Sequence, residues 1–206
     1  MKELIFCVGV IVSFIICFII GNFIYRLDNK KNFNILNSFP FEMISKRNNF
    51  NLLFRILLAI FISLSCIDIL YLFIYHFDSD FLSRFIGIVL ILEALMLLGL
   101  FLVSSILYKG HILISSLFFV LNIISFILIG YKGIVEKGEL WISIIAFIVS
   151  FIELIIIFLP QLKNWYKLEI NDEQYIKPKF NLYVFFEWIN IITFIVSLTL
   201  YTINYL

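Results

Sequence analysis

Hydrophobic residues come in six long runs that are separated by short polar segments. The runs cover residues 4–25, 52–77, 81–107, 112–130, 141–160 and 182–205. A membrane-spanning helix needs about 20 predominantly apolar residues, so each run predicts one such helix. The connections between the second and fifth runs are short, which makes those helices antiparallel neighbours. The pattern predicts an all-α fold: a polytopic integral membrane protein, a bundle of six transmembrane helices in which residues 1–206 form a single domain.

The composition agrees with a membrane protein and removes several other classes. The chain is 63% hydrophobic and 14% charged, with a mean hydropathy of +1.10. Soluble domains have about 45–50% apolar and about 25% charged residues. The net charge of +1 gives no basic face for nucleic acid. All three cysteines lie inside apolar runs without metal-binding spacing, and we expect no cofactor.

The distribution of lysine and arginine predicts the orientation in the membrane. If the N-terminus is outside, the cytoplasmic loops are residues 26–51, 108–111 and 161–181. These loops and the adjoining helix ends hold eleven of the 15 basic residues, and the outer side holds four. Because basic residues concentrate on the cytoplasmic side, both termini are expected to be extracytoplasmic. The expected location is the plasma (cell) membrane.

Small residues repeat every four positions along the first span. They are Gly9, Ser13, Cys17 and Gly21, which we call the small-residue seam. Residues at this spacing share one helix face, and small residues let helix backbones approach closely within a membrane. The seam predicts close helix packing, either within the chain or against a membrane-protein partner or a second copy.

The other five spans each carry polar residues along one face, which is expected to turn away from lipid. The polar stripes are Ser65, Asp68, Tyr71 and Tyr75 in the second span; Glu93 and Ser104 in the third; His111, Ser115, Asn122 and Ser125 in the fourth; Ser143, Ala146, Ser150 and Glu153 in the fifth; and Glu187, Asn190, Ser197, Tyr201 and Asn204 in the sixth.

Four stripe residues are acids at overlapping depths: Asp68, Glu93, Glu153 and Glu187. At a rise of 1.5 Å per residue, Glu93 and Glu153 lie about 18 Å below the outer surface. The apolar surroundings disfavour an unpaired carboxylate, so the acids are expected to be protonated, to share a proton or to hold a cation. One interpretation is a proton or cation site. The other is that protonated acids form hydrogen bonds between helices, each worth about 0.6–2 kcal/mol.

The segment HFDSD offers a weak metal site. His76, Asp78 and Asp80 stand at alternating positions on the expected outer turn, where imidazole and carboxylates can face one ion. The alternative is that Ser79 or Asp80 caps the third span. Three residues fall short of a defined metal site, and we expect none here.

The basic loop 26–51 contains an unusually apolar stretch, Phe39, Pro40, Phe41, Glu42 and Met43, which we call the FPFEM segment. Pro40 fits a first helical turn, and Glu42 suits the positive end of the helix dipole. Aromatic residues flanked by lysine and arginine are typical of an interfacial membrane anchor. A second interpretation is an exposed docking segment for a cytoplasmic partner.

No HExxH, GxSxG or Walker A sequence is present, and we expect no enzymatic activity. The expected function is contact with a membrane partner, as an accessory, immunity or assembly component. The alternative is a small proton- or cation-linked transporter or channel that uses the acids within the spans. An intramembrane enzyme would require those acids or HFDSD to form a reactive site.

Overall fold

The computed structural model describes residues 2–44, 48–75, 81–103, 108–137, 140–159 and 179–203. Within these residues the chain is all-helical, and six helices are long and apolar enough to cross a membrane. They are α1 (Lys2–Asn29), α2 (Asn48–Tyr75), α3 (Phe81–Leu102), α4 (Tyr108–Lys132), α5 (Leu140–Ile157) and α7 (Leu182–Ile203). Two single turns accompany them, η1 (Pro40–Met43) and η3 (Gly133–Lys137). The six predicted helices are confirmed, and they suggest a multi-pass membrane protein.

Some helix ends differ from the prediction. The expected loop 108–111 is the first turn of α4, because α4 begins at Tyr108. Likewise α1 continues past its apolar run to Asn29, where Lys30 takes a left-handed conformation (φ 52°) and donates its N–H to the Arg26 carbonyl at 3.0 Å. Backbone hydrogen bonds carry a helix beyond the hydrocarbon layer, so the last apolar residue does not mark its end.

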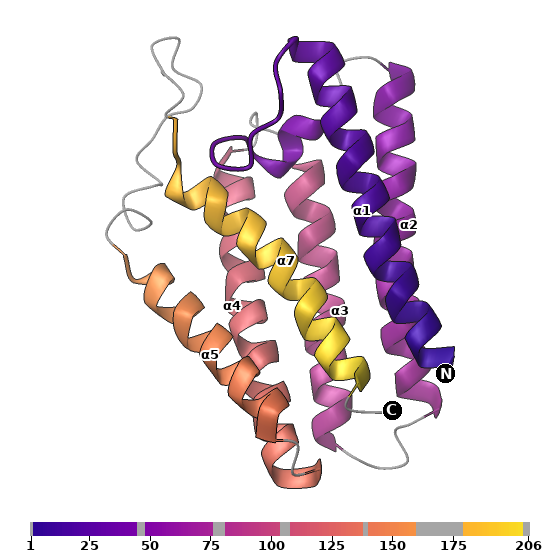
Figure 1. The fold of residues 1–206 in the computed structure, drawn as a ribbon, viewed down its shortest axis with the longest axis vertical. Coiled ribbons are helices and arrows are strands. Elements are labelled where there is room, and N and C mark those ends of the chain that lie inside the picture. The colour runs from indigo at the N-terminus through magenta and orange to yellow at the C-terminus, as the bar shows by residue number, and fades with distance from the viewer. Residues whose placement is uncertain are drawn as a thin grey trace.

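The helices alternate in direction, and α7 runs diagonally across the bundle (Figure 1). Successive helices from α1 to α5 are neighbours, and α7 contacts chiefly α4 and α1. Both ends of the described chain, at α1 and α7, lie at one end of the bundle, the terminal end (Figure 1). The loop of residues 30–44 lies at the opposite end, the loop end.

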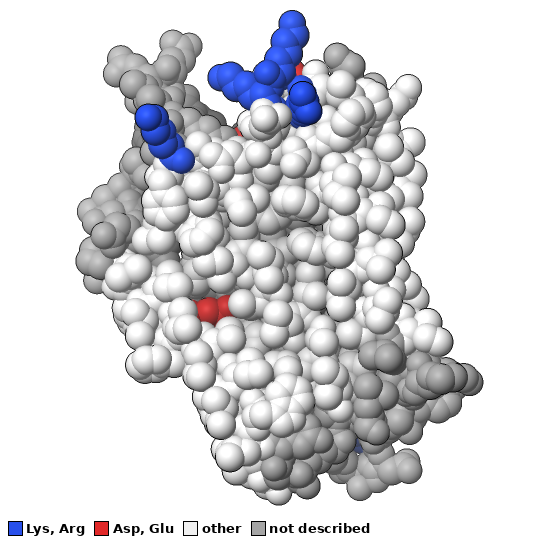
Figure 2. Space-filling model, in the orientation of Figure 1, with Lys and Arg blue, Asp and Glu red and all other residues white. Residues whose placement is uncertain are grey.

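Charge is confined mainly to the ends of the bundle (Figure 2). The visible lysine and arginine side chains gather mostly at the loop end, which carries Arg26, Lys30, Lys31 and Lys179. Between the ends, the described residues on this face are uncharged apart from one small acidic patch (Figure 2). An uncharged belt between polar ends is the surface that a bilayer requires.

The predicted inward orientation of the polar stripes is confirmed. Every described stripe side chain is buried, apart from the half-buried Tyr71. Most exposed side chains on the same helices are apolar, such as Ile74, Leu113 and Phe151. The remaining three stripe side chains, those of Tyr75, Ser104 and Asn204, lie outside the described set. The bundle therefore has a partly polar interior.

Candidate functional site

Buried polar side chains form a line along the contact between α4 and α7, from one end of the bundle to the other. It divides into three groups. The loop-end group is His111, Ser115 and Glu187; the middle group is Glu93, Asn122, Ser125, Glu153, Asn190 and the half-buried Thr193; and the terminal-end group is Asp68, Ser83, Lys132, Tyr201 and Thr202. The four acids predicted as one site are thus distributed among three groups, and only Glu93 and Glu153 come together.

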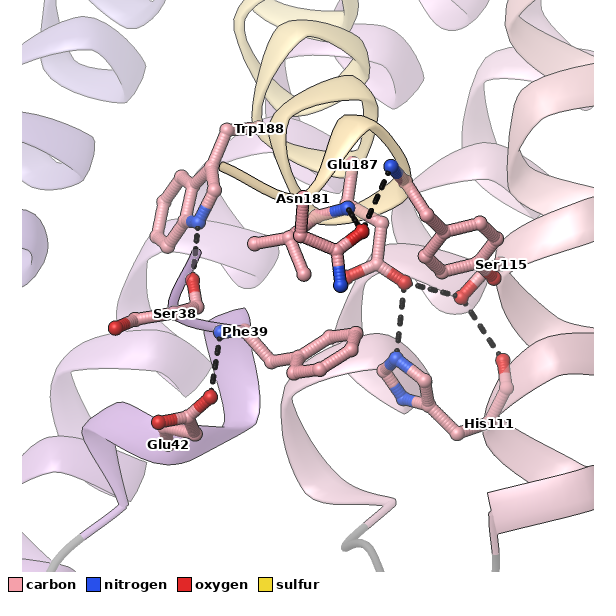
Figure 3. Close-up of polar contacts among 10 residues, drawn as sticks. Ser38, Phe39, Glu42, His111, Ser115, Asn181, Glu187 and Trp188 are labelled. Carbon is pink, nitrogen blue, oxygen red and sulfur yellow. Dashed lines mark hydrogen bonds and ion pairs between the residues drawn. The ribbon is translucent and has the colours of Figure 1, made fainter. Parts of the chain in front are cut away.

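In the loop-end group, one carboxylate oxygen collects two contacts (Figure 3). Glu187 Oε1 lies 2.9 Å from His111 Nε2. The Ser115 hydroxyl lies 2.7 Å from the same oxygen and 2.9 Å from the His111 carbonyl, and it can donate its hydrogen to either. All three side chains are fully buried. Because Ser115 pairs with Glu187 and not with the imidazole, the trio lacks the Ser–His contact of a hydrolytic triad.

The FPFEM segment covers this group. The Phe39 and Phe41 rings stand edge-on to the His111 ring, with centroids 5.7 and 4.9 Å from it. Phe39 and Met43 are 3% and 1% exposed, and Pro40 is buried as well. The expected exposed anchor or docking segment is therefore wrong for these three residues, because the loop folds back into the bundle end. Phe41 and Glu42 are half-buried.

Local hydrogen bonds explain why the loop turns inward. The Phe39 N–H donates to Glu42 Oε1 at 2.9 Å, which caps η1, and Pro40 begins its helical turn. The buried Trp188 indole of α7 donates to the Ser38 carbonyl at 2.9 Å (Figure 3). The Asn181 N–H donates to the Leu36 carbonyl at 2.8 Å. The loop thus supplies acceptors for two donors at the start of α7.

The middle group is rich in acceptors. None of the carboxylate oxygens of Glu93 and Glu153 has a hydrogen-bond partner in the described part of the chain, and the two side chains are 0% and 1% exposed. The Glu93 carboxyl lies within electrostatic reach of Glu153 and beside the Ser125 and Asn122 side chains. The Glu153 carboxyl lies beside Thr193. Two acids on α3 and α5 therefore share a polar environment built by α4 and α7.

The terminal-end group joins four helices, α2, α3, α4 and α7. Tyr201 Oη donates to the Ser83 carbonyl at 2.9 Å, and the buried Lys132 ammonium donates to the Ser83 hydroxyl. Thr202 Oγ1 lies 3.2 Å from Asp68 Oδ2 and 2.9 Å from the Leu198 carbonyl. Asp68 is therefore held near the terminal end and not beside Glu93. Lys132, the last residue of α4, is buried in this group.

The small-residue seam splits into two halves. At Gly21 an added Cβ would lie 2.6 Å from the Phe54 ring and 2.7 Å from Met43 Sδ, and Cys17 is buried within the chain. At Gly9 an added Cβ would meet nothing within 4 Å, and Ser13 is half-buried with its hydroxyl on the Val10 carbonyl. The loop-end half is used inside the chain, and the half around Gly9 is open.

The candidate metal trio His76, Asp78 and Asp80 lies outside the described residues. Among the residues that the structure describes, no group of three or more His, Cys, Asp or Glu side chains is placed to hold a metal ion. The middle group contains two acids, Glu93 and Glu153, and two amides, so it has fewer than three side chains of these four types.

Sequence reasoning missed the partners of the acids. His111 and Ser115, which hold Glu187, and Asn122 and Asn190, which stand in the middle group, appear in the sequence only as members of polar stripes. The stripes indicated which face of each helix turns inward. They carried no signal for which stripes meet at the same depth.

Comparison with known proteins gives no further identification. The chain matches no protein-family model, no curated protein and no solved structure.

Proposed function

We propose that this protein is a proton- or cation-linked transporter or channel, with the polar line between α4 and α7 as its ion path. The observation that carries the proposal is the pair Glu93 and Glu153, buried within electrostatic reach of each other and without protein partners among the described residues. Acids inside transmembrane bundles are costly, and they mark proton and ion pathways. A purely structural role would direct the neighbouring donors at the acids, whereas the Ser125 and Thr193 hydroxyls beside them donate to backbone carbonyls.

The rest of the line supports a path. The loop-end and terminal-end groups extend the polar line on both sides of the middle acids. Within them Glu187 is held by His111 and Ser115, and Asp68 by Thr202, so neither acid belongs to the ion site. The FPFEM segment closes the line at the loop end by covering His111. We propose that the loop end faces the cytoplasm of a plasma membrane, because the loops and helix ends assigned to that side hold eleven of the 15 basic residues.

The test is ion flux in liposomes that contain the purified full-length protein. A pH-sensitive dye and a Ca²⁺- or Na⁺-sensitive dye inside the vesicles report which ion moves when a gradient is imposed. We expect flux that Glu93→Gln and Glu153→Gln each reduce at least tenfold. Asp28→Asn, which removes a carboxylate at the loop end away from the line, serves as the matched control and should keep the flux. Absence of flux for every ion tested would refute the proposal.

A second candidate function rests on α1. Its apolar window is the least buried of the six helices, and Gly9 leaves open space on its surface. This open half of the seam can take a helix of a membrane partner or of a second copy. If contact is the function, Gly9→Leu should abolish co-purification or self-association, while Glu93→Gln and Glu153→Gln should leave it unchanged. Transport predicts the reverse sensitivity in the flux assay.

A further inference from the structure

We propose that Glu93, Glu153, Asn122 and Asn190 form a binding site for a hard divalent cation of the Ca²⁺ class. This site rests on the proposed function only where the ion is said to move across the membrane, because binding of the ion is measured separately. The site draws on α3, α4, α5 and α7, and it uses side-chain oxygens alone.

The first argument is the number of free acceptor oxygens. Six side-chain oxygens of these residues have no hydrogen-bond partner in the described chain: both oxygens of each glutamate and the Oδ1 atoms of Asn122 and Asn190. The asparagine side chains are fully buried. Buried polar atoms are nearly always paired, so six orphaned acceptors in one group indicate that a ligand supplies the positive charge.

Second, hydrogen bonds to backbone carbonyls fix the orientation of the two asparagine amides and of the neighbouring hydroxyls. Asn122 Nδ2 donates to the backbone carbonyl of Asn190 at 3.0 Å, and Asn190 Nδ2 donates to the backbone carbonyl of Phe186 at 2.9 Å. These bonds fix the amide orientation, because a carbonyl cannot accept from Oδ1. The Ser125 and Thr193 hydroxyls donate to the Asn122 and Asn190 carbonyls. Each amide therefore presents Oδ1 and one remaining N–H to its surroundings.

The third argument is that the four residues form one connected group. Asn122 lies beside the Glu93 carboxyl, so its unpartnered, fully buried oxygen belongs to the surroundings of that acid. The Thr193 hydroxyl lies beside Glu153 and donates to the backbone carbonyl of Asn190. The same backbone carbonyl accepts from Asn122 Nδ2. Glu93 thus lies beside the Asn122 amide, Glu153 lies beside the hydroxyl that bonds the Asn190 backbone, and the two acids lie within electrostatic reach of each other.

The ligand set selects the class of ion. Carboxylate and amide oxygens are ligands of hard cations, whereas zinc and copper sites use imidazole or thiolate. The basic side chains described on α4 are engaged elsewhere: His111 with Glu187, and Lys132 with Ser83. A doubly charged ion neutralises two carboxylates in an apolar interior, where an excess charge is costly. Because Mg²⁺ usually keeps several waters, a site of protein oxygens favours Ca²⁺.

Two protonated carboxyls would satisfy the group less well. Protonation of Glu93 and Glu153 supplies two hydrogens and the second N–H of each amide supplies one more, so at least two of the six acceptors stay without a partner. A cation that accepts 6–8 oxygen ligands engages the whole set at once.

The experiment is equilibrium dialysis of the chelator-treated full-length protein in detergent against radioactive Ca²⁺, with Mg²⁺, Na⁺ or K⁺ as competitors. We expect saturable binding of one Ca²⁺ per chain that Na⁺ and K⁺ do not displace. Glu93→Gln and Glu153→Gln should each weaken binding about tenfold or more. Glu187→Gln and Asp68→Asn, which remove acids of the other two groups, should bind as the wild type does.

Thermal unfolding provides the folding control. Ca²⁺ should raise the unfolding temperature of the wild type, of Glu187→Gln and of Asp68→Asn, and leave that of Glu93→Gln and Glu153→Gln unchanged. The proposal is overturned if the wild type shows no saturable Ca²⁺ binding, if both Glu→Gln variants keep it, or if only Na⁺ or K⁺ binds. Binding without flux in liposomes would uphold this site and refute transport, and flux without binding would do the reverse.

Discussion

Buried glutamates in two regions of the bundle differ in their hydrogen-bond partners. In the loop-end group, Glu187 Oε1 has His111 and Ser115 within 2.9 Å, and the FPFEM segment covers the imidazole. In the middle group, Glu93 and Glu153 have no hydrogen-bond partner among the described residues, and each lies in the other's electrostatic field. Both regions are closed to solvent, so burial does not explain the difference.

The difference separates acids that hold the fold from acids available for binding. A buried donor or acceptor that loses its partner costs about 1–3 kcal/mol, so Glu187 and His111 stabilise the contact between α4 and α7. The middle acids give the fold no such bond. Retaining them is therefore a cost to folding that a binding function accounts for. Variants in the two regions should accordingly change different properties.

The largest loss of stability is expected on uncovering the loop-end group. Phe39→Ala removes a buried ring that packs on His111 and Phe41, and a buried Phe→Ala change costs about 3 kcal/mol. Phe180→Ala is the control, since Phe180 is 51% exposed. Chemical denaturation in detergent measures both. Equal stability of the two variants would show that the segment does not cover the bundle end.

A smaller loss is expected from breaking the pair inside the loop-end group. His111→Leu leaves Glu187 with Ser115 alone, and we expect the free energy of unfolding to fall by about 2 kcal/mol. Glu187→Gln should cost less, because the amide oxygen still accepts. The same denaturation measurement applies. A His111→Leu protein as stable as the wild type would remove the distinction between the two regions.

The two ends of the small-residue seam should respond with opposite signs. Gly21→Ala drives a methyl into Phe54 and Met43. A packing cost of about 2 kcal/mol is partly offset by a gain of about 1 kcal/mol in helix propensity, so stability falls by about 1 kcal/mol. Gly9→Ala meets open space and should be neutral or stabilising by up to about 1 kcal/mol. Thermal unfolding of the pair tests whether loop and α1 pack together; an equal response would contradict it.

The smallest change in stability is expected in the middle group. Glu93→Gln and Glu153→Gln remove no hydrogen bond to a described residue, and the new N–H₂ groups can donate to neighbouring oxygens. We expect stability within about 0.5 kcal/mol of the wild type or above it, measured without added Ca²⁺. A loss as large as that of His111→Leu would make these acids structural and would contradict the comparison.

Much of the fold follows from local pattern. The apolar runs located all six helices, and the stripes identified their inward faces, including Asn122 and Glu153. Both features follow from the sequence of a single helix. The pairing of Glu187 with His111 does not, because it depends on the depth at which α4 and α7 cross. The FPFEM segment has the composition of both an interfacial anchor and a core segment, and only the donor of Trp188 and the packing at Gly21 decide between them.

The central claim is that the middle acids form a site that an ion reaches through water, whereas Glu187 belongs to a closed structural contact. The most direct test places single cysteines at positions 93, 153 and 187 in a protein from which Cys7, Cys17 and Cys66 have been removed. A membrane-impermeant thiol reagent is then added from each side of the membrane. Asn32→Cys, in the exposed loop, is the reactive control, and Leu90→Cys, packed in the core, is the unreactive one.

The account predicts labelling at position 93 or 153 from at least one side, with position 187 protected from the loop side by the FPFEM segment. Protection of both 93 and 153 from either side, in a folded protein whose Asn32→Cys control reacts, would contradict it.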